Sequence, residues 1–292
     1  LGGRFKTLLE LVFEYNDEGA LATDLERLQI GYTFSDALTL WAGRFHTPYG
    51  YWNTAFHHGA QIQSAILRPK IIAFEDQGGV LPAHTVGLWS TGHTRLGNGR
   101  LEYDAYVGNG GRILDGVLDF NAVKDDNKNL LVGGNLRFRF GGVMNGLALG
   151  VHAFSEKVST YSSTALDSTT KVNMLGAYGF YDGNDWEVIG EYYGFRDTQA
   201  GAGGSKHSSW AGFMQVGRSF GDILPYVRFE KALLDQADNY FLSQNSGRSY
   251  QRQALGLRYE IGPKTALKVE MNHTDESGTK YKEAQVQAAI RF

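Results

Sequence analysis

Histidine and serine side chains are the candidates for catalysis in this sequence. An imidazole could activate a serine hydroxyl, and the candidate residues are His57, His84 and His152 with Ser90 or Ser208. The sequence lacks the G-x-S-x-G motif that exposes a nucleophilic serine on a sharp turn, and no spacing links these residues into a pair. We therefore expect no catalytic residues and no enzymatic activity.

Two short motifs resemble metal-binding sequences. His57 and His58 are adjacent, but adjacent residues rarely converge on one ion without further ligands. The run Asp182-Gly183-Asn184-Asp185 resembles part of a calcium loop, yet the remaining ligand positions are missing and its composition is that of a turn. We expect neither a metal site nor a cofactor.

Charged residues recur at alternate positions within otherwise apolar segments. The basic candidates are Arg4, Lys6, Arg27, Arg228, Arg252, Arg258, Lys268 and Arg291. The acidic candidates are Glu102, Asp104, Glu187 and Glu191. In a membrane barrel such charges must point into the lumen, where rings of charge set ion selectivity. We therefore predict that both groups line a pore.

The segments that carry these charges alternate with a period of two, which predicts strands with two different faces. Near the end of the chain, for example, Leu267, Val269 and Met271 oppose Lys268 and Glu270. The same pattern runs along the whole length without a linker or a shift in composition. We predict a single domain over residues 1–292.

The gaps between these strands are alternately short and long. The short gaps contain Gly, Asn, Asp or Pro, which favour tight hairpins, and they fall near residues 34–37, 96–99, 141–146, 182–185, 221–222 and 262–264. The long gaps are 16–23, 46–83, 109–128, 156–169, 197–206, 235–249 and 274–282. Short turns at one end and long loops at the other are typical of outer-membrane barrels. We predict an all-β, antiparallel, up-and-down transmembrane barrel of about fourteen strands, with twelve or sixteen as alternatives.

Composition excludes other classes of protein. The chain has 292 residues, no Cys, 38 Gly and a net charge of −3, which indicates no nucleic-acid partner. No run of about 18 apolar residues is present, so a helical membrane protein is excluded. A soluble β-barrel or sandwich is the alternative, but aromatic residues cluster near strand ends as in membrane girdles, at Tyr15, Trp186, Tyr192, Trp210 and Tyr259.

The last segment alternates in the same way, with Val286, Ala288, Ile290 and the terminal Phe292 on one face. With this ending the chain resembles Gram-negative outer-membrane porin-like barrels, whose mature chains commonly end in such a strand. The resemblance implies location in the cell outer membrane among its lipids, and assembly by the barrel-assembly machinery. It is also compatible with a homotrimer.

The longest gap, about 46–83, follows the motifs GRF at 43–45 and TPYGYWN at 47–53. These motifs resemble the region before the constriction loop of phosphate-selective-type porins. The resemblance implies that this long extracellular loop folds into the lumen, where its charged residues are Arg68, Lys70, Glu75 and Asp76. The loop is the second here, whereas it is usually the third in that family, and Lys70 is its only Lys, so phosphate specificity is not expected.

The expected function is an outer-membrane porin, a water-filled channel for passive diffusion of small hydrophilic solutes or ions. One hypothesis is that the loop carboxylates face the basic wall and create a transverse field; the alternative is that these charges form salt bridges that brace the barrel. The alternative function is an export channel for a polypeptide, such as the functional amyloid subunits of pseudomonads. The chain begins at Leu1 as expected of a mature or trimmed form, and a helical extension upstream would favour export.

Overall fold

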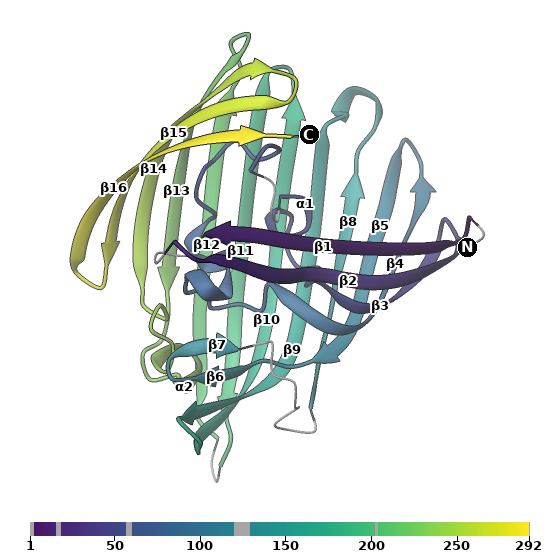
Figure 1. Cartoon of the computed structure of the whole chain (residues 1–292). Helices are drawn as coiled ribbons and strands as arrows, with labels where there is room; N and C mark the ends of the chain where they lie inside the picture. The colour runs from purple at the N-terminus through teal and green to yellow at the C-terminus, as the bar shows by residue number, and fades with distance from the viewer. Residues whose placement is uncertain (1–2, 16–18, 57–59, 120–128, 202–203, 292) are drawn as a thin grey trace.

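The computed structural model describes residues 3–15, 19–56, 60–119, 129–201 and 204–291, and these form a curved antiparallel sheet (Figure 1). Its sixteen strands are β1 (Phe5–Tyr15), β2 (Leu21–Ser35), β3 (Leu38–His46), β4 (His84–Leu96), β5 (Gly99–Asn109), β6 (Arg112–Leu114), β7 (Val117–Asp119), β8 (Leu130–Arg139), β9 (Leu147–Ser162), β10 (Ala165–Gly183), β11 (Trp186–Gln199), β12 (Lys206–Arg218), β13 (Ile223–Leu233), β14 (Tyr250–Gly262), β15 (Thr265–Glu276) and β16 (Thr279–Ile290). The helices are α1 (Trp52–Ala55), α2 (Asn239–Leu242), η1 (Lys70–Ile72), η2 (Glu75–Gln77) and η3 (Gly142–Met144). Among the described residues, no helix has the length and apolar character needed to cross a membrane.

The sheet has sixteen strands, so the predicted number of about fourteen is wrong and the alternative of sixteen is the number found. The path of hydrogen-bonded neighbours contains fourteen of them, in the order β1-β2-β3-β4-β5-β8 and then β9 to β16. The other two, β6 and β7, pair with each other, and β6 also pairs in parallel with β9. They were missed because each has three residues, too few for an alternating pattern, and both lie in the predicted loop 109–128.

Two other predicted loops, 156–169 and 274–282, are mostly strand. β9 and β10 extend to a turn at 163–164, and β15 and β16 meet at a turn where Ser277 and Gly278 have φ of 50° and 92°. These strand ends carry Ser, Thr and charged residues on both faces, so no apolar face marked them as strands. In contrast, Asn184 and Asp185 have φ of 50° and 66°, as in a type I′ hairpin, which confirms the predicted turn.

The apolar side chains of the strands face outward and the charged ones inward. On β13 and β14, Phe229 and Leu255 are 60% and 59% exposed, while Arg228 and Glu230 are buried. Further outward residues on β15 and β16 are Leu267, Val269, Met271 and Val286. A soluble β-protein would bury this apolar set, so the soluble alternative is wrong and the outer face is suited to lipid.

Aromatic side chains also lie on the outer face, some of them near strand ends. Trp186, Tyr192 and Tyr259 are exposed, and the ring of Tyr192 stacks on that of Trp210 at 6.2 Å between centroids. The side chain of Tyr15 lies outside the described part of the chain. Trp186 and Tyr259 therefore agree with the predicted interfacial girdles, whereas Tyr192 and Trp210 lie in the interiors of β11 and β12, so their predicted places near strand ends are wrong.

The predicted closure of the sheet into a ring is not found. Among the described residues, no ladder joins β1 to β16, and the sheet path ends at these two strands. In Figure 1, β1 and β2 run across the direction of β9 to β13, and the C-terminal end of β16 lies apart from them. Alternation predicts which face of a strand points outward, but it carries no information on whether the two end strands pair.

Candidate pore and constriction loop

The long segment between β3 and β4 lies against the inner face of the sheet. We call residues 47–83 the inner loop. It leaves the wall after His46 and returns at His84, which are paired in the β3–β4 ladder. Trp52 is fully buried in this loop, and Tyr51 stacks on Phe180 of β10 at 4.1 Å between ring centroids. Figure 1 shows α1, which belongs to this loop, inside the curved sheet.

Carboxylates of β11 hold the first part of the inner loop. Glu191 accepts hydrogen bonds from the backbone N–H groups of Tyr51 at 3.2 Å and Trp52 at 2.6 Å. Glu187 accepts a hydrogen bond from the hydroxyl of Ser64 at 2.5 Å. Glu187 and Glu191, two of the four predicted acidic residues, therefore face inward and bind the loop.

Carboxylates of β13 and β15 hold the middle of the loop. Glu270 accepts from the N–H of Ile66 at 2.8 Å, and Glu230 accepts from the N–H of Lys70 at 2.7 Å. The ammonium of Lys70 forms an ion pair with Glu276 at 2.7 Å. Buried backbone N–H groups need acceptors, so these carboxylates fix the path of the loop.

Two of the predicted basic residues bind loop carbonyls. Arg258 donates to the carbonyl of Gln63 at 2.8 Å, and Lys268 donates to that of Ala65 at 3.1 Å. Lys268 is fully buried on the inner face of β15, and the outer face of this strand is apolar. These cations satisfy backbone acceptors of the loop.

Arg228 and Arg252 share one carboxylate. The Nε atoms of both donate to Glu230 Oε1 at 2.8 Å. Arg252 also donates to the carbonyl of Arg68, and the guanidinium of Arg228 lies 5.8 Å from the ring centroid of Trp52. This network is buried and joins β13, β14 and the loop.

Of the two loop carboxylates, the structure describes the side chain of Glu75, and it binds the loop and not the basic wall. Glu75 accepts from the backbone N–H of Ala83 and from that of His84 at 3.2 Å, so it binds the returning end of the loop itself. The side chain of Asp76 lies outside the described part of the chain. The contacts therefore correspond to the bracing alternative, in which wall charges pair with each other and with the loop.

Arg68 supports the loop from within. It donates to the carbonyl of Ile72 at 2.8 Å and to Asn53 Oδ1 at 2.7 Å, and it lies 4.1 Å from the ring centroid of Phe74. Burial lowers the pKa of Arg68 to about 10, so the guanidinium is still charged at neutral pH.

A polar cavity of about 360 Å³ lies at the strands that the inner loop does not cover. Its lining residues come from β1 to β5, β8 and the turn after β2, and they are Lys6, Thr33, Ser35, Asp36, Thr39, Thr91, Gly92, His93, Arg100, Glu102, Tyr103, Asp104, Arg137 and Arg139. Of the predicted pore residues, this cavity brings together Lys6, Glu102 and Asp104.

Glu102 is the centre of the charge cluster in this cavity. It accepts from Arg137 at 2.5 Å and from Arg139 at 3.1 Å, and it forms an ion pair with Arg100. Side-chain exposure is 48% for Arg100 and 37% for Arg139, so both guanidiniums contact solvent in the cavity. Asp104 accepts from the indole N–H of Trp89 at 3.0 Å.

The remaining predicted basic residues lie away from these two groups. Arg27 pairs with Glu10 at 2.5 Å. Arg4 and Arg291 are exposed, and their backbones pair with Thr33 and Lys264 beside short turns. These two are therefore placed at the short-turn rim of the sheet.

Several inward residues were not among the predicted site residues. They are Arg100, Arg137, Arg139, Glu230 and Glu270. Their signal was present, because each occupies the polar face of an alternating segment. What was missing was the pairing of strands, which places the three arginines around one carboxylate.

Where the structure describes them, the residues considered for catalysis do not gather in one place. His152 is buried on the inner face, and its ring lies 5.1 Å from that of Tyr193. Ser90 and Ser208 share the outward side of their strands with exposed Leu88 and Met214. His57 and His58 lie outside the described residues.

No protein-family model and no curated protein matches this sequence. Solved structures do match, at 12% identity. OmpT, an outer membrane protein of Vibrio cholerae, has a TM-score of 0.62 over 99% of this chain and 86% of its own. An anion-selective porin from Comamonas acidovorans has 0.60 over 99% and 84%. The outer membrane channel DcaP of Acinetobacter baumannii has 0.56 over 97% and 79%.

Each of these proteins is an outer-membrane barrel, and the match extends over nearly the whole chain. The expected location, the outer membrane, is the location of the OmpT and DcaP proteins by their descriptions. OmpT has also been solved in a trimer form, with a TM-score of 0.54. The chain has the fold of outer-membrane porin-like β-barrels.

Proposed function

We propose that this protein is an outer-membrane porin, a water-filled channel for passive diffusion of small hydrophilic solutes or ions. The observation that carries the proposal is the polar cavity inside an apolar outer wall. Half-exposed Arg100 and Arg139 lie in that cavity beside the carboxylates of Glu102 and Asp104. Charged side chains with access to water inside a lipid-facing sheet are what an aqueous path requires.

The predicted pore residues then divide into four groups by role. Lys6, Glu102 and Asp104 line the solute path together with the arginines of β5 and β8. Arg228, Arg252, Arg258, Lys268, Glu187 and Glu191 hold the inner loop, which narrows the channel from the opposite side. Arg4 and Arg291 contribute charge at the short-turn rim, and Arg27 braces β1 against β2.

The packing of the inner loop argues against export of a polypeptide. A translocating chain needs a wide lumen, whereas Tyr49, Trp52 and Ile72 of the loop are fully buried against the wall. We also propose that the protein is not an enzyme, because, among the described candidates, His84 and His152 are buried whereas Ser90 and Ser208 lie on the outward side of the sheet. The OmpT trimer supports a homotrimer as the assembly to test, with lipid and the barrel-assembly machinery as partners.

Current recording from the refolded protein in a planar lipid bilayer tests this function. We expect stepwise increases in conductance in potassium chloride, and swelling of proteoliposomes in small sugars. Refolding is checked independently by the heat-dependent shift in electrophoretic mobility that folded barrels show. Folded protein that inserts into liposomes but gives neither current steps nor swelling would contradict the proposal.

A further inference from the structure

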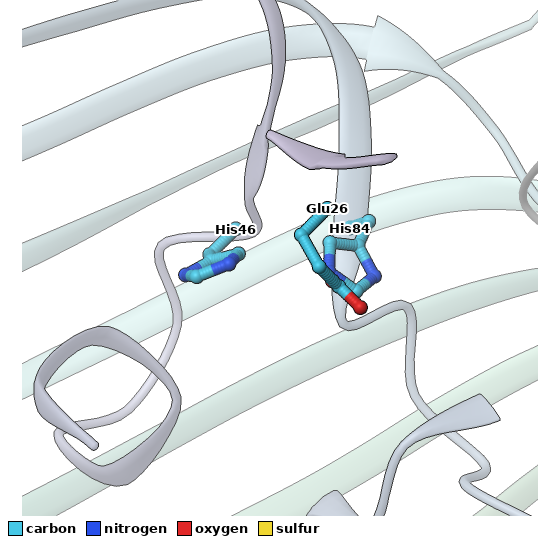
Figure 2. A group of neighbouring side chains, drawn as sticks. All are labelled: Glu26, His46 and His84. Carbon is cyan, nitrogen blue, oxygen red and sulfur yellow. The ribbon is translucent and has the colours of Figure 1, made fainter. Parts of the chain in front are cut away.

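Three metal-ligating side chains meet where the inner loop leaves and rejoins the wall. They are Glu26 of β2, His46 at the end of β3 and His84 at the start of β4. One ligand atom of each lies within 4.8 Å of the others. Figure 2 shows the carboxylate of Glu26 beside the ring of His84, with His46 on the facing strand end.

A bulge places Glu26 in this cluster. The β1–β2 ladder pairs Glu10 with Arg27 and then Leu11 with Leu25, so Glu26 is the extra residue of β2. A bulge re-aims side chains relative to the regular alternation, and Glu26 is accordingly buried. The cluster therefore depends on a specific break in the strand pattern.

The distances are compatible with one shared ion. Glu26 Oε2 lies 2.7 Å from His84 Nε2, and the rings of His46 and His84 are 5.4 Å apart between centroids. Ligand atoms around a tetrahedral zinc with bonds of about 2.1 Å are about 3.4 Å apart. The ligand atoms of the three residues lie within 4.8 Å of one another, and one pair is 2.7 Å apart, so small side-chain rotations would bring them to this spacing.

Further carboxylates surround the two imidazoles. Glu75 Oε2 lies 3.6 Å from His84 Nδ1, on the ring nitrogen opposite to the one that faces Glu26. A carboxylate in this position orients a metal-binding histidine and keeps the proton on the outer nitrogen. Glu10 Oε2 lies 3.9 Å from His46 Nε2.

The local charge also favours a cation. Two guanidiniums approach the cluster: Arg27 pairs with Glu10 at 2.5 Å, and Arg44 donates to the backbone carbonyl of Glu26 at 3.1 Å. Their two positive charges are fewer than the three negative charges of the carboxylates of Glu10, Glu26 and Glu75. With neutral imidazoles, the group has an excess of one negative charge.

We propose that Glu26, His46 and His84 form a binding site for a divalent transition-metal ion of the zinc class, at the point where the inner loop leaves and rejoins the wall. Two imidazoles and one carboxylate suit Zn²⁺, Ni²⁺ or Cu²⁺, with water at the open position. A bound ion ties both ends of the loop to β2. This site does not depend on the channel function, because its three ligands are held by the strand ends at the base of the inner loop and not by any solute in the lumen.

Titration calorimetry with Zn²⁺ on the refolded full chain in detergent micelles tests the site, and Co²⁺ absorption reports the coordination. The variants are His46→Gln, His84→Gln and Glu26→Gln. The matched control is His273→Gln, because His273 lies on the outward side of β15 beside Met271. Folding of each variant is checked by its heat-dependent electrophoretic mobility.

We expect one Zn²⁺ per chain, binding at least tenfold weaker in His46→Gln and Glu26→Gln, and unchanged binding in His273→Gln. Glu75→Gln should weaken binding by about tenfold to a hundredfold through the orientation of His84. His46 lies at a strand end, so its variant keeps the test valid if His84→Gln does not fold. Absence of saturable binding by the wild type, or wild-type affinity in both His46→Gln and Glu26→Gln, overturns the proposal.

Discussion

The two sides of the sheet use the same alternating sequence pattern for different purposes. On β11 to β15, inward charges such as Glu191 and Lys268 bind the backbone of the inner loop. On β5 and β8, inward charges such as Arg139 lie at a cavity and are partly exposed. The strands of both sides alternate in the same way, so the inner loop makes the difference. Charges that the loop covers hold it in place, and charges that it leaves uncovered are available to solutes.

The largest effect is expected from the carboxylate that Arg228 and Arg252 share. Replacing Glu230 by Ala leaves buried guanidiniums without their common partner, which costs about 3–5 kcal/mol in the free energy of unfolding. Guanidinium titration followed by tryptophan fluorescence measures this loss. Glu260→Ala is the control, because the side chain of Glu260 is 39% exposed and its pair with Arg258 is worth at most about 1 kcal/mol. Equal losses in both variants would show that burial does not separate structural charge pairs from dispensable ones on the loop-covered wall.

A smaller effect is expected from the anchor at the start of the inner loop. Glu191→Ala removes the acceptor of the N–H groups of Tyr51 and Trp52, which costs about 1–3 kcal/mol. The released loop should give larger and noisier single-channel currents. Glu283→Ala on β16 is the control, because this carboxylate is exposed. Currents from Glu191→Ala identical to those of the wild type would show that the anchor does not hold the loop.

Ion selectivity should respond on one side of the sheet only. The double substitution Arg100→Ala/Arg139→Ala removes two exposed cations from the cavity, and we expect about a twofold fall in the anion-to-cation permeability ratio, limited by screening. Arg258→Ala should change this ratio little, because Arg258 is occupied with Glu260 and the carbonyl of Gln63. Reversal potentials in a salt gradient provide the comparison. A larger shift in Arg258→Ala would restore the transverse-field hypothesis.

The smallest effect concerns a surface loop outside both regions. The N–H of Ala237 and the ring of His207 lower the pKa of Asp235 from its usual 3.8. A depressed pKa stabilises the fold above the unfolded value, and that contribution is lost as pH falls below about 3.8. Asp235→Asn should therefore be less stable than the wild type at pH 7 by under about 1 kcal/mol, with the difference vanishing in acid. Thermal melts of both proteins at pH 7 and in acid measure this difference in stability. A difference that grows in acid would refute the lowered pKa of Asp235.

The sequence was sufficient to predict the class of fold and the orientation of its faces. Alternation in β15 predicted that Leu267 and Lys268 lie on opposite faces, because a period of two fixes the side of every residue once one is known, and Leu267 is exposed while Lys268 is buried. It was insufficient where the pattern stops. β6 and β7 are too short to show it, and the polar ends of β9 and β10 have no apolar face.

The site was only partly predictable for a related reason. Alternation placed Glu102 and Arg137 on the polar face, but only the β5–β8 pairing brings them together, since residues 109–128 separate these strands in sequence. Likewise Glu26 gave no signal, because a bulge reverses the rule that assigns its side. Long-range pairing and irregularities of register cannot be read from the period of a single strand.

The central claim is that solutes pass along the side of the lumen that the inner loop leaves open. The chain has no Cys, so a single introduced cysteine can be modified by a charged thiol reagent during current recording. Thr91→Cys lies in the polar cavity, whereas Gln215→Cys lies on the loop-covered wall, where Gln215 donates to Ser64 at 2.8 Å. We predict a stepwise fall in single-channel current for Thr91→Cys and no change for Gln215→Cys. Block through Gln215→Cys with no effect at Thr91→Cys would contradict the account.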